Sequence, residues 1–246
     1  MLAMAAVACE HTPAIAPEAS LVAVLDELDV PASASVLVGA GDIASCEELA
    51  GAVATAALVR AMIERTPDAV VFTTGNHAYP DGSPEQFEAC YEPAWGEFNA
   101  RTVPAPGNHD YETEGAEGFF GYFDVFRERS EARGGGYYDV TLGAWRIVVL
   151  NSLLPLEPRS PQLEWIDRRL DADGRPRSDG ARQFTVGTDG ADLHPIVRRR
   201  RHSEYLTNET YGVLVLILHA DGYEWAFVGT DGVVHDRSDE RVACST

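Results

Sequence analysis

The feature that most restricts the fold of this chain is a strand–helix–strand order in its first third. Two short apolar segments, Ser35–Val38 and Ala69–Thr73, have the composition of buried strands. Between them, Glu47–Arg65 is rich in alanine, and its apolar residues recur at helical spacing. The first strand leads to Gly41-Asp42 and the second to Gly75-Asn76. Because ligands in α/β sheets collect at the carboxyl ends of strands, we expect these polar residues to converge on one site.

The rest of the chain is predicted to alternate helices with polar loops and then to become mostly β. Pro104–Asp110 is expected to be a rigid loop that places a third polar cluster beside the first two. The order favours an α/β fold, a two-sheet β-sandwich flanked by helices. We expect residues 1–34 to be a disordered or processed N-terminus and residues 35–242 to form a single domain. The further predicted helices are Pro84–Tyr91, Phe119–Arg129 and Pro161–Leu170, and the further strands are Tyr137–Leu142, Trp145–Leu150, Gln183–Val186, Tyr211–His219, Tyr223–Val228 and Val233–His235.

Charge and composition exclude several classes of function. The 246 residues carry a net charge of −20 and include no lysine. Such acidity argues against nucleic-acid binding, which needs cations to replace phosphate counterions, and against docking on an anionic membrane. No apolar run is long enough to span a membrane.

The N-terminal residues and the cysteines bear on the compartment. Leu2–Ala8 is apolar and ends at Cys9, which resembles the end of an incomplete secretion signal or a lipoprotein cleavage site. We therefore expect an exported protein (periplasmic, extracellular or lipid-anchored), with a cytoplasmic protein that has a frayed N-terminus as the alternative. Cys46 and Cys90 each lie close to a polar motif, so they are either disulfide partners or two buried thiols.

The polar loop residues have the chemistry of metal ligands. Asp42 follows a strand and a glycine, and Asn108-His109-Asp110 follows Pro106-Gly107. Carboxylate, amide and imidazole groups are hard or borderline ligands. Each residue alone is more typical of a turn, and it is their order along the chain that indicates a metal site.

This order resembles the calcineurin-like metallophosphoesterases, in particular bacterial relatives of the purple acid phosphatases. The resemblance is dense from Val36 to Leu170 and looser from Arg182 to His235. It depends on a series of motifs, which are Gly41-Asp42-Ile43-Ala44, Gly75-Asn76-His77-Ala78-Tyr79-Pro80-Asp81-Gly82, Cys90-Tyr91-Glu92-Pro93-Ala94-Trp95-Gly96, Pro104-Ala105-Pro106-Gly107-Asn108-His109-Asp110-Tyr111, Leu150-Asn151-Ser152 and Gln162-Leu163-Glu164-Trp165.

The resemblance implies a phosphoric ester hydrolase of the acid phosphatase kind, in which two metal ions (iron, zinc or manganese) act on a phosphorylated small molecule. It implies that Asp42 is a terminal ligand of the first metal and that Tyr79 binds ferric iron through its phenolate. Asn108 is implied to be the amide ligand of the second metal. His109 is expected to contact the phosphate or protonate the leaving group, and Asp110 to orient that histidine or cap the loop.

The first departure from the family pattern lies at the metal bridge. The family motif is Gly-Asp-Asn-x-Tyr, whereas this chain has Gly75-Asn76-His77-Ala78-Tyr79. Asn76 therefore occupies the position where a bridging aspartate is expected. A carboxylate offers one anionic oxygen to each metal, whereas an amide offers one neutral oxygen. We consider the hypothesis that His77 compensates by supplying a nitrogen ligand.

The second departure is the lack of three histidines that the family places after the helix at Pro161. On the order of sixty residues are missing relative to the usual domain size, near residues 171–181. The loss is expected to leave unpaired strand edges and to favour self-association. The resulting interpretation is a two-metal phosphomonoester hydrolase with impaired catalysis. The alternative is a non-catalytic pseudophosphatase or interaction module that binds at most one metal or an anion.

Overall fold

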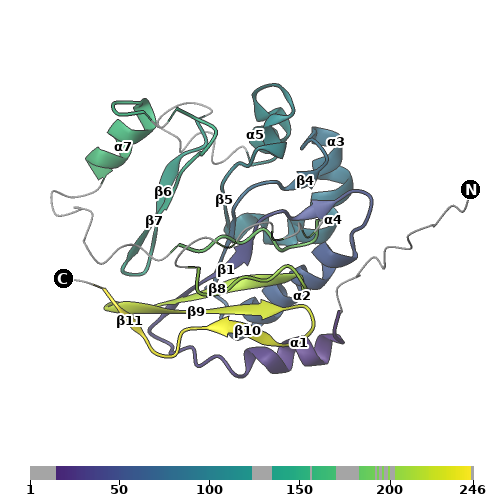
Figure 1. The fold of residues 1–246 in the computed structure, drawn as a ribbon, viewed down its shortest axis with the longest axis vertical. Coiled ribbons are helices and arrows are strands. Elements are labelled where there is room, and N and C mark those ends of the chain that lie inside the picture. Colours follow the sequence, from purple (N-terminus) through teal and green to yellow (C-terminus); the bar gives the residue numbers. More distant parts are fainter. Residues whose placement is uncertain are drawn as a thin grey trace, which may run out of the picture.

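The computed structural model describes residues 15–123, 135–155, 157–169, 183–191, 193, 196, 199 and 203–244. Its centre is a seven-stranded mixed sheet with the strand order β10-β9-β8-β1-β3-β5, and β11 also pairs with β9 (Figure 1). The strands of this sheet are β1 (Ser35–Ala40), β3 (Val70–Thr73), β5 (Thr102–Pro104), β8 (Gly212–Leu218), β9 (Gly222–Gly229), β10 (Val234–Arg237) and β11 (Val242–Ala243).

The first half of the sheet is parallel and places the polar loops at one edge. β1 pairs with β3 and β3 with β5 in parallel, so their carboxyl ends point the same way. The helix α2 (Ala50–Arg65) makes the connection between β1 and β3, as the alanine-rich pattern predicts. It begins three residues later than predicted, because the backbone N–H groups of Glu47 and Ala50 bond to side chains in a turn.

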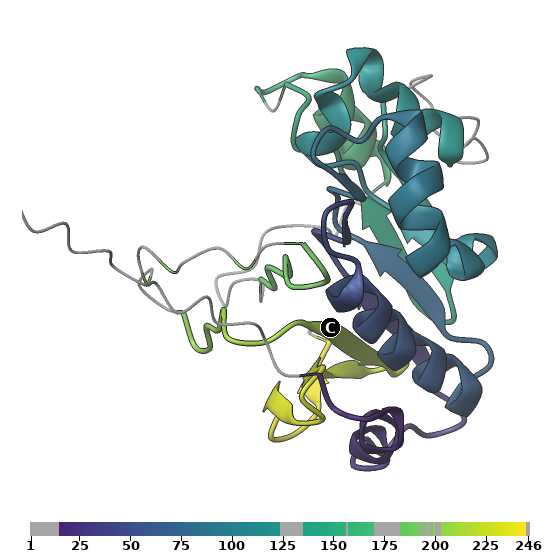
Figure 2. The same ribbon diagram turned by 90° about the vertical axis from the view of Figure 1, so that its right-hand side faces the viewer.

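The main core lies between the sheet and α2. Val36 and Val38 of β1 are fully buried and belong to the same apolar cluster as Leu58 and Met62 of α2. Figure 2 shows α2 lying along one face of the strands. Because side chains alternate across a strand, the residue between the two valines, Leu37, faces the opposite side of the sheet.

A continuous helical segment covers the region between β4 and β5. The predicted helix Pro84–Tyr91 is present and extends further, through a π-helical turn, to a 3-10 segment. Beyond β5, Phe119–Tyr122 is helical as predicted, and residues 124–129 of that prediction lie outside the described residues. The bounds are α1 (Glu18–Leu25), α3 (Pro84–Gln86), η1 (Phe87–Tyr91), α4 (Glu92–Trp95), η2 (Gly96–Arg101), η3 (His109–Tyr111), η4 (Glu114–Ala116), α5 (Glu117–Tyr122) and α7 (Pro161–Arg169).

Within the described residues, the second layer of β structure is the antiparallel pair β6 (Tyr138–Leu142) and β7 (Trp145–Val149). This pair packs on the sheet face opposite α2, where Val103 of β5 contacts the cluster of Tyr138 and Val149. The fold is therefore the expected α/β arrangement of a central sheet flanked by helices, with a small second sheet. The region of the expected deletion, residues 171–181, lies outside the described residues.

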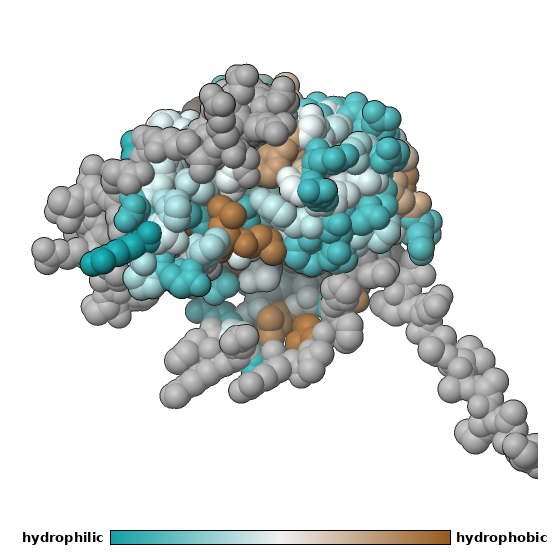
Figure 3. All heavy atoms as spheres, turned by 90° about the horizontal axis from the view of Figure 1, so that it is seen from above, coloured by the Kyte–Doolittle hydropathy of each residue, from teal (hydrophilic) through white to brown (hydrophobic). Residues whose placement is uncertain are grey.

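Among the described strands, β5 lies at the edge of the sheet and pairs only with β3. All three residues of this edge strand are buried, and the Tyr138 hydroxyl donates to the Pro104 carbonyl oxygen at 2.7 Å. Figure 3 shows apolar residues in small patches among hydrophilic ones on the face seen there. Exposed large apolar side chains in the described residues include Leu150, Leu153 and Leu206.

The second half of the sheet is antiparallel and follows the predictions closely, with one exception. β8 pairs with both β1 and β9, which joins the C-terminal strands to the first strand of the fold. The predicted strand Gln183–Val186 is wrong, because these residues belong to no ladder. Instead, the Val186 carbonyl oxygen accepts a hydrogen bond from the Thr74 hydroxyl at 3.0 Å, which places this segment beside the polar loops.

The N-terminal prediction is wrong for residues 18–28. Glu18–Leu25 forms α1, which packs on α2, and Leu25 and Leu28 are buried in the main core. An ion pair between Asp26 and Arg65 joins the ends of the two helices. Burial of these apolar side chains explains the order, since it offsets the entropy lost when the segment folds. Residues 1–14, including Cys9, lie outside the described residues. Among the described helices, none is long and apolar enough to cross a membrane.

The packing of α1 can be tested by truncating Leu25, which is fully buried. Leu25→Ala is expected to lower the free energy of unfolding by about 2–5 kcal/mol, because it removes buried methyl groups and leaves a cavity. Urea unfolding followed by circular dichroism measures the change. Val53→Ala, on the exposed face of α2 (53% exposed), is the control and should change stability little. Equal stability of Leu25→Ala and the parent would show that α1 does not belong to the core.

Candidate functional site

Three loops meet at the carboxyl ends of the parallel strands. Asp42 follows β1, Asn76 follows β3 and Asn108 follows β5. The first two loops are joined by backbone hydrogen bonds from Asp42 N–H to Gly75 O (3.0 Å) and from Ile43 N–H to Asn76 O (2.9 Å). They continue into the short parallel pair β2 (Ala44–Ser45) and β4 (Ala78–Tyr79). The predicted convergence of polar residues is therefore present in the structure.

The backbone at these loops is left-handed, and this conformation aims the side chains at one another. Asp42 has φ 58° and Asn76 has φ 57°, a region that aspartate and asparagine tolerate better than most residues. Gly75 has φ 102°, and a Cβ there would collide with the backbone of Gly107. The glycines before the polar residues therefore allow the loops to approach closely.

The side-chain amide of Asn76 lies at the centre of the site. Its oxygen accepts a hydrogen bond from His109 N–H at 2.9 Å. Its nitrogen lies 2.8 Å from Asp42 Oδ1, 3.1 Å from Tyr79 Oη and 3.4 Å from Asn108 Oδ1. The four residues implied as metal ligands by the family resemblance are thus brought together, with the Asn76 amide nitrogen within 3.4 Å of a side-chain oxygen of each of the other three.

Tyr79 contributes a second donor to the same carboxylate. Its hydroxyl donates to Asp42 Oδ1 at 2.7 Å. Burial, followed by the hydrogen bond to Asp42 and the charge of that carboxylate, raises the pKa of the Tyr79 phenol well above its usual value. In this arrangement Tyr79 is a neutral phenol, and its ring lies against the His109 ring with centroids 4.4 Å apart.

The His109 imidazole is fixed on one side and free on the other. Nδ1 lies 2.6 Å from the Pro80 carbonyl oxygen, which can only accept, so Nδ1 carries a proton. Nε2 has no hydrogen-bond partner among the described residues, and the side chain is half-buried. The ring is thus oriented with one nitrogen available to a ligand.

Asp110 is the residue that holds the loops in place. It is fully buried and accepts hydrogen bonds from the backbone N–H groups of Gly107 (2.8 Å), Asn76 (3.0 Å) and His77 (3.1 Å). Burial alone would raise the pKa of its carboxyl, but the adjacent His77 and these hydrogen bonds lower it. Of the two roles expected for Asp110, these contacts are those of a loop cap. None of its described hydrogen bonds reaches the His109 ring.

His77, considered above as a compensating metal ligand, lies in the core in this structure. His77 is fully buried, and its Nδ1 lies 3.0 Å from Asp110 Oδ2 while its Nε2 lies 2.6 Å from Thr73 Oγ1. Its ring is packed among aromatic side chains of the core. Because both nitrogens are engaged and the ring points into the core, His77 cannot replace the ligand that Asn76 lacks.

Two further contacts position the surroundings of the site. Cys46, after β2, forms a disulfide with Cys90 of η1, with Cα atoms 5.2 Å apart. At the end of β7, Asn151 is buried and its amide donates to Tyr111 Oη at 2.8 Å, while its backbone exchanges two hydrogen bonds with the Gln162 side chain. These contacts attach η1, β7 and α7 to the loops that form the site.

Asp189 is a buried carboxyl beside the site that the sequence did not indicate. Its backbone N–H donates to Gly41 O at 3.1 Å, and the next two N–H groups donate to Asp42 O. The side chain is fully buried, and within the described part of the chain neither oxygen has a hydrogen-bond partner. Burial, and then the charge of Asp42, raise the pKa of Asp189 well above its usual value. An aspartate followed by a glycine is typical of a turn, so no sequence signal distinguishes it.

The donors present do not fit a two-metal centre. Asp42 supplies the only carboxylate among the four converging residues, and its Oδ1 already accepts two hydrogen bonds. Within the described part of the chain, no group of three or more histidine, cysteine, aspartate or glutamate side chains could hold a metal ion. His219 and His235 pair with Glu224 and Asp231 in the antiparallel half of the sheet.

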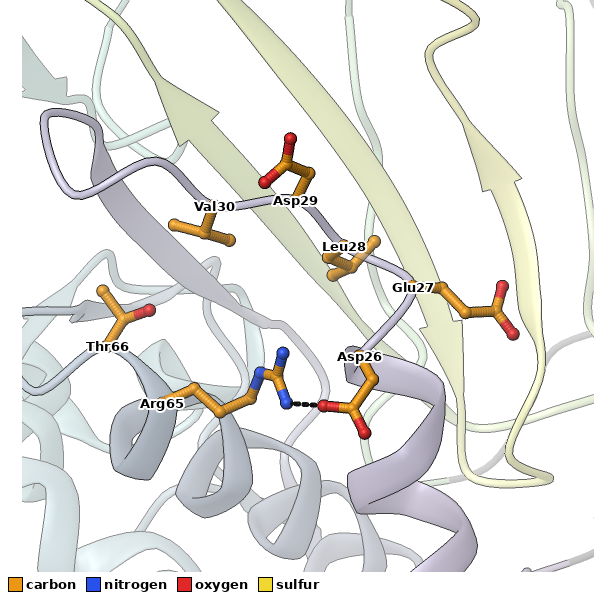
Figure 4. Close-up of a pocket in the computed structure, with 7 residues that line it drawn as sticks. All are labelled: Asp26, Glu27, Leu28, Asp29, Val30, Arg65 and Thr66. Atoms are coloured by element: carbon orange, nitrogen blue, oxygen red, sulfur yellow. Dashed lines mark hydrogen bonds and ion pairs between the residues drawn. The ribbon is translucent and has the colours of Figure 1, made fainter.

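A surface pocket lies at the opposite end of the parallel strands. It is lined by residues 26–30 and by Arg65 and Thr66, which precede β1 and β3 (Figure 4). The Asp26–Arg65 ion pair closes one side of it. Since the converging loops follow the carboxyl ends of the same strands, this pocket is separate from the candidate site.

Comparisons with known proteins agree with this architecture. The model of the calcineurin-like phosphoesterase family matches residues 36–179. Among solved structures, the chain is similar to the purple acid phosphatase PPD1 isolated from yellow lupin (Lupinus luteus) seeds, with a TM-score of 0.59 and 15% identity, over 84% of this chain and 53% of that chain. This similarity shows the fold, and the chain spans about half the length of that phosphatase chain. A search of curated proteins gave no match.

The fold and the position of the site define the metallophosphoesterase class. The family match covers more than half of the chain. The protein therefore belongs to the calcineurin-like phosphoesterase family, which confirms the resemblance found in the sequence.

The role of Asp110 as a loop cap leads to a stability prediction. Asp110→Asn should lower the free energy of unfolding by about 3–5 kcal/mol, because an amide nitrogen would face N–H donors and His77 would lose its charged partner. Because the folded-state pKa of Asp110 is lowered, its stabilising effect is present above the unfolded-state pKa and is lost as the pH falls toward the folded-state value. Urea unfolding from pH 7 to pH 3 measures both effects. Glu112→Gln, an exposed neighbour, is the control, and an equal effect of the two substitutions would refute the role.

The raised pKa of Asp189 leads to the opposite prediction for how the stability of the fold depends on pH. Its raised folded-state pKa means that the folded protein retains a proton that the unfolded chain releases, so stability falls as the pH rises above the unfolded-state pKa. Asp189→Asn should therefore gain stability relative to the parent between pH 5 and pH 8. Thermal unfolding across this range measures the gain, with the exposed Asp239→Asn as the control. A constant difference between Asp189→Asn and the parent at all pH values would contradict the assignment.

Proposed function

We propose that this protein is a phosphomonoester hydrolase of the metallophosphoesterase family in which catalysis is impaired at the metal centre. The observation that carries the proposal is the amide of Asn76 at the meeting point of the three loops, 2.8 Å from Asp42 Oδ1. The family supplies the reaction class, and the layout of Asp42, Tyr79, Asn108 and His109 supports a site of the same kind. In such a site metal ions would polarise the phosphate and provide the nucleophile.

Electrostatics explains why an amide at this position impairs the centre. Two metal ions about 3.5–4 Å apart repel each other, and a bridging carboxylate offsets that repulsion with one anionic oxygen for each ion. The Asn76 amide is neutral, and its single oxygen already accepts the His109 N–H group. Even changes in groups that merely orient metal ligands typically cost about 10–100-fold in affinity or activity. Loss of the bridge itself is expected to cost at least as much.

The remaining residues offer one group that could contact a phosphate and one that would repel it. His109 presents a free Nε2 that, when protonated, can donate to a phosphate oxygen or to a leaving group. Asp42 carries a negative charge, and no arginine is among its described hydrogen-bond partners. A phosphate dianion would therefore be repelled unless a cation is bound. We propose that any iron, zinc or manganese binds weakly, through Asp42 and Asn108.

The compartment belongs to the same proposal. A disulfide between Cys46 and Cys90 is typical of proteins that fold in an oxidising environment. This supports export to the periplasm or the extracellular space, where acid phosphatase-like activity would meet phosphorylated small molecules.

The proposal is tested by measuring metal content and activity on one sample. After incubation with Mn²⁺, Zn²⁺ or Fe³⁺ and gel filtration, elemental analysis should find less than one metal ion per chain, because the bridging carboxylate is absent. Hydrolysis of an aryl phosphate should fall well below the turnover of about 1–10³ s⁻¹ that is usual for enzymes. Asp42→Asn should remove the residual activity. Two retained metal ions with ordinary turnover would refute the impairment, and no activity at all, unchanged by Asp42→Asn, would favour a non-catalytic protein.

A further inference from the structure

We infer that the Asn76 amide takes the place of a bound cation, and that the substitution Asn76→Asp converts the site into a cation-binding site. The inference depends on the proposed function, because it concerns the same centre. It goes further by stating what stabilises the site in the absence of metal. The side-chain NH₂ group of Asn76 places the positive end of its dipole among the side-chain oxygens of Asp42, Tyr79 and Asn108.

The orientation of the amide is set by its surroundings. The oxygen of Asn76 accepts the His109 backbone N–H at 2.9 Å, and a backbone N–H can only donate. The nitrogen must therefore face Asp42 Oδ1 at 2.8 Å, which can only accept when Asp42 is ionised. The reverse orientation would oppose donor to donor and acceptor to acceptor, so the hydrogen-bond partners assign the amide unambiguously.

The oxygen atoms around the Asn76 amide are acceptors whose negative charge would otherwise have to be balanced by a cation. Asp42 Oδ1 receives two donors, the Asn76 amide and the Tyr79 hydroxyl, and Asn108 Oδ1 lies 3.4 Å from the same amide nitrogen. A partly buried carboxylate is costly unless it is paired or hydrogen-bonded. Here two neutral donors satisfy it, and the loops can close without an ion.

The backbone at position 76 is suited to aspartate as well as asparagine. The left-handed φ of 57° is tolerated by both residues, and the two side chains have the same shape. A Cβ on Gly107 would collide with Asn76 Oδ1, so the glycine allows the loop after β5 to approach this side chain closely. The hydrogen bonds to His109 N–H and Asp42 Oδ1 fix its orientation. An aspartate here would place a second anionic oxygen where the amide nitrogen lies, about 3 Å from Asp42 Oδ1. Two carboxylates at this distance repel each other unless a proton or a cation lies between them.

The experiment compares three variants with the parent chain, using Mn²⁺ and Zn²⁺ as probes. Asn76→Asp should unfold at a temperature lower by at least about 3 °C in EDTA, and the probes should restore the loss. Titration calorimetry should show that it binds Mn²⁺ at least tenfold more tightly than the parent. Asn76→Gly, which keeps the backbone unstrained and removes the amide without adding charge, should lose stability in EDTA and gain no such affinity.

The exchange variant Asp42→Asn with Asn76→Asp keeps the inference testable if the single variant does not fold in EDTA. This variant again has one carboxylate and one amide at positions 42 and 76, so it should recover the stability that the parent has without metal. Failure of Asn76→Asp to gain affinity, or failure of the exchange variant to recover stability, would overturn the inference. The proposed function is judged separately, on the parent chain: it fails if that chain retains two metal ions with ordinary turnover, or if it shows no activity that Asp42→Asn removes.

Discussion

The buried carboxylate of Asp110 is the constraint on which the rest of the site depends. It accepts hydrogen bonds from the loop after β3 and from its own loop after β5, and it pairs with His77 in the aromatic core. Because backbone N–H groups buried in a loop must find acceptors, one carboxylate that serves three of them fixes two loops against each other. The positions of Asn76 and His109 follow from this arrangement, although neither side chain contributes to it.

The chemistry of the site is determined by a difference of one atom in a side chain. An aspartate and an asparagine have the same shape, and both suit the left-handed backbone at position 76. They differ in whether the atom that faces Asp42 is an anionic oxygen or an N–H donor. With the donor, Asn76, Asp42 and Tyr79 satisfy one another by hydrogen bonds. The proposed impairment follows from the negative charge that an aspartate would add at this position.

The sequence predicted the parts of the structure that depend on local pattern. The helix α2, the paired strands β6 and β7, and the C-terminal strands follow from apolar periodicity, and the convergence of Asp42, Asn76 and Asn108 follows from their places after strands. The pattern failed where long-range contacts decide. The sequence gives no sign of order at residues 18–28 because their burial depends on contacts with α2, which is distant in sequence. Residues 183–186 form no ladder, and the Val186 carbonyl oxygen instead accepts a hydrogen bond from Thr74.

The sequence by itself indicated the family, most of the order of elements, and the asparagine at position 76 where the family resemblance implies an aspartate. These features are carried by residue types and spacing along the chain. Only the tertiary structure decided that His77 points into the core, that Asp110 caps the loops, and that Asp189 lies unpartnered beside Asp42. The direction and the burial of a side chain depend on neighbours that are distant in sequence. A single sequence records which groups are present, whereas the packing of the chain decides which of them meet.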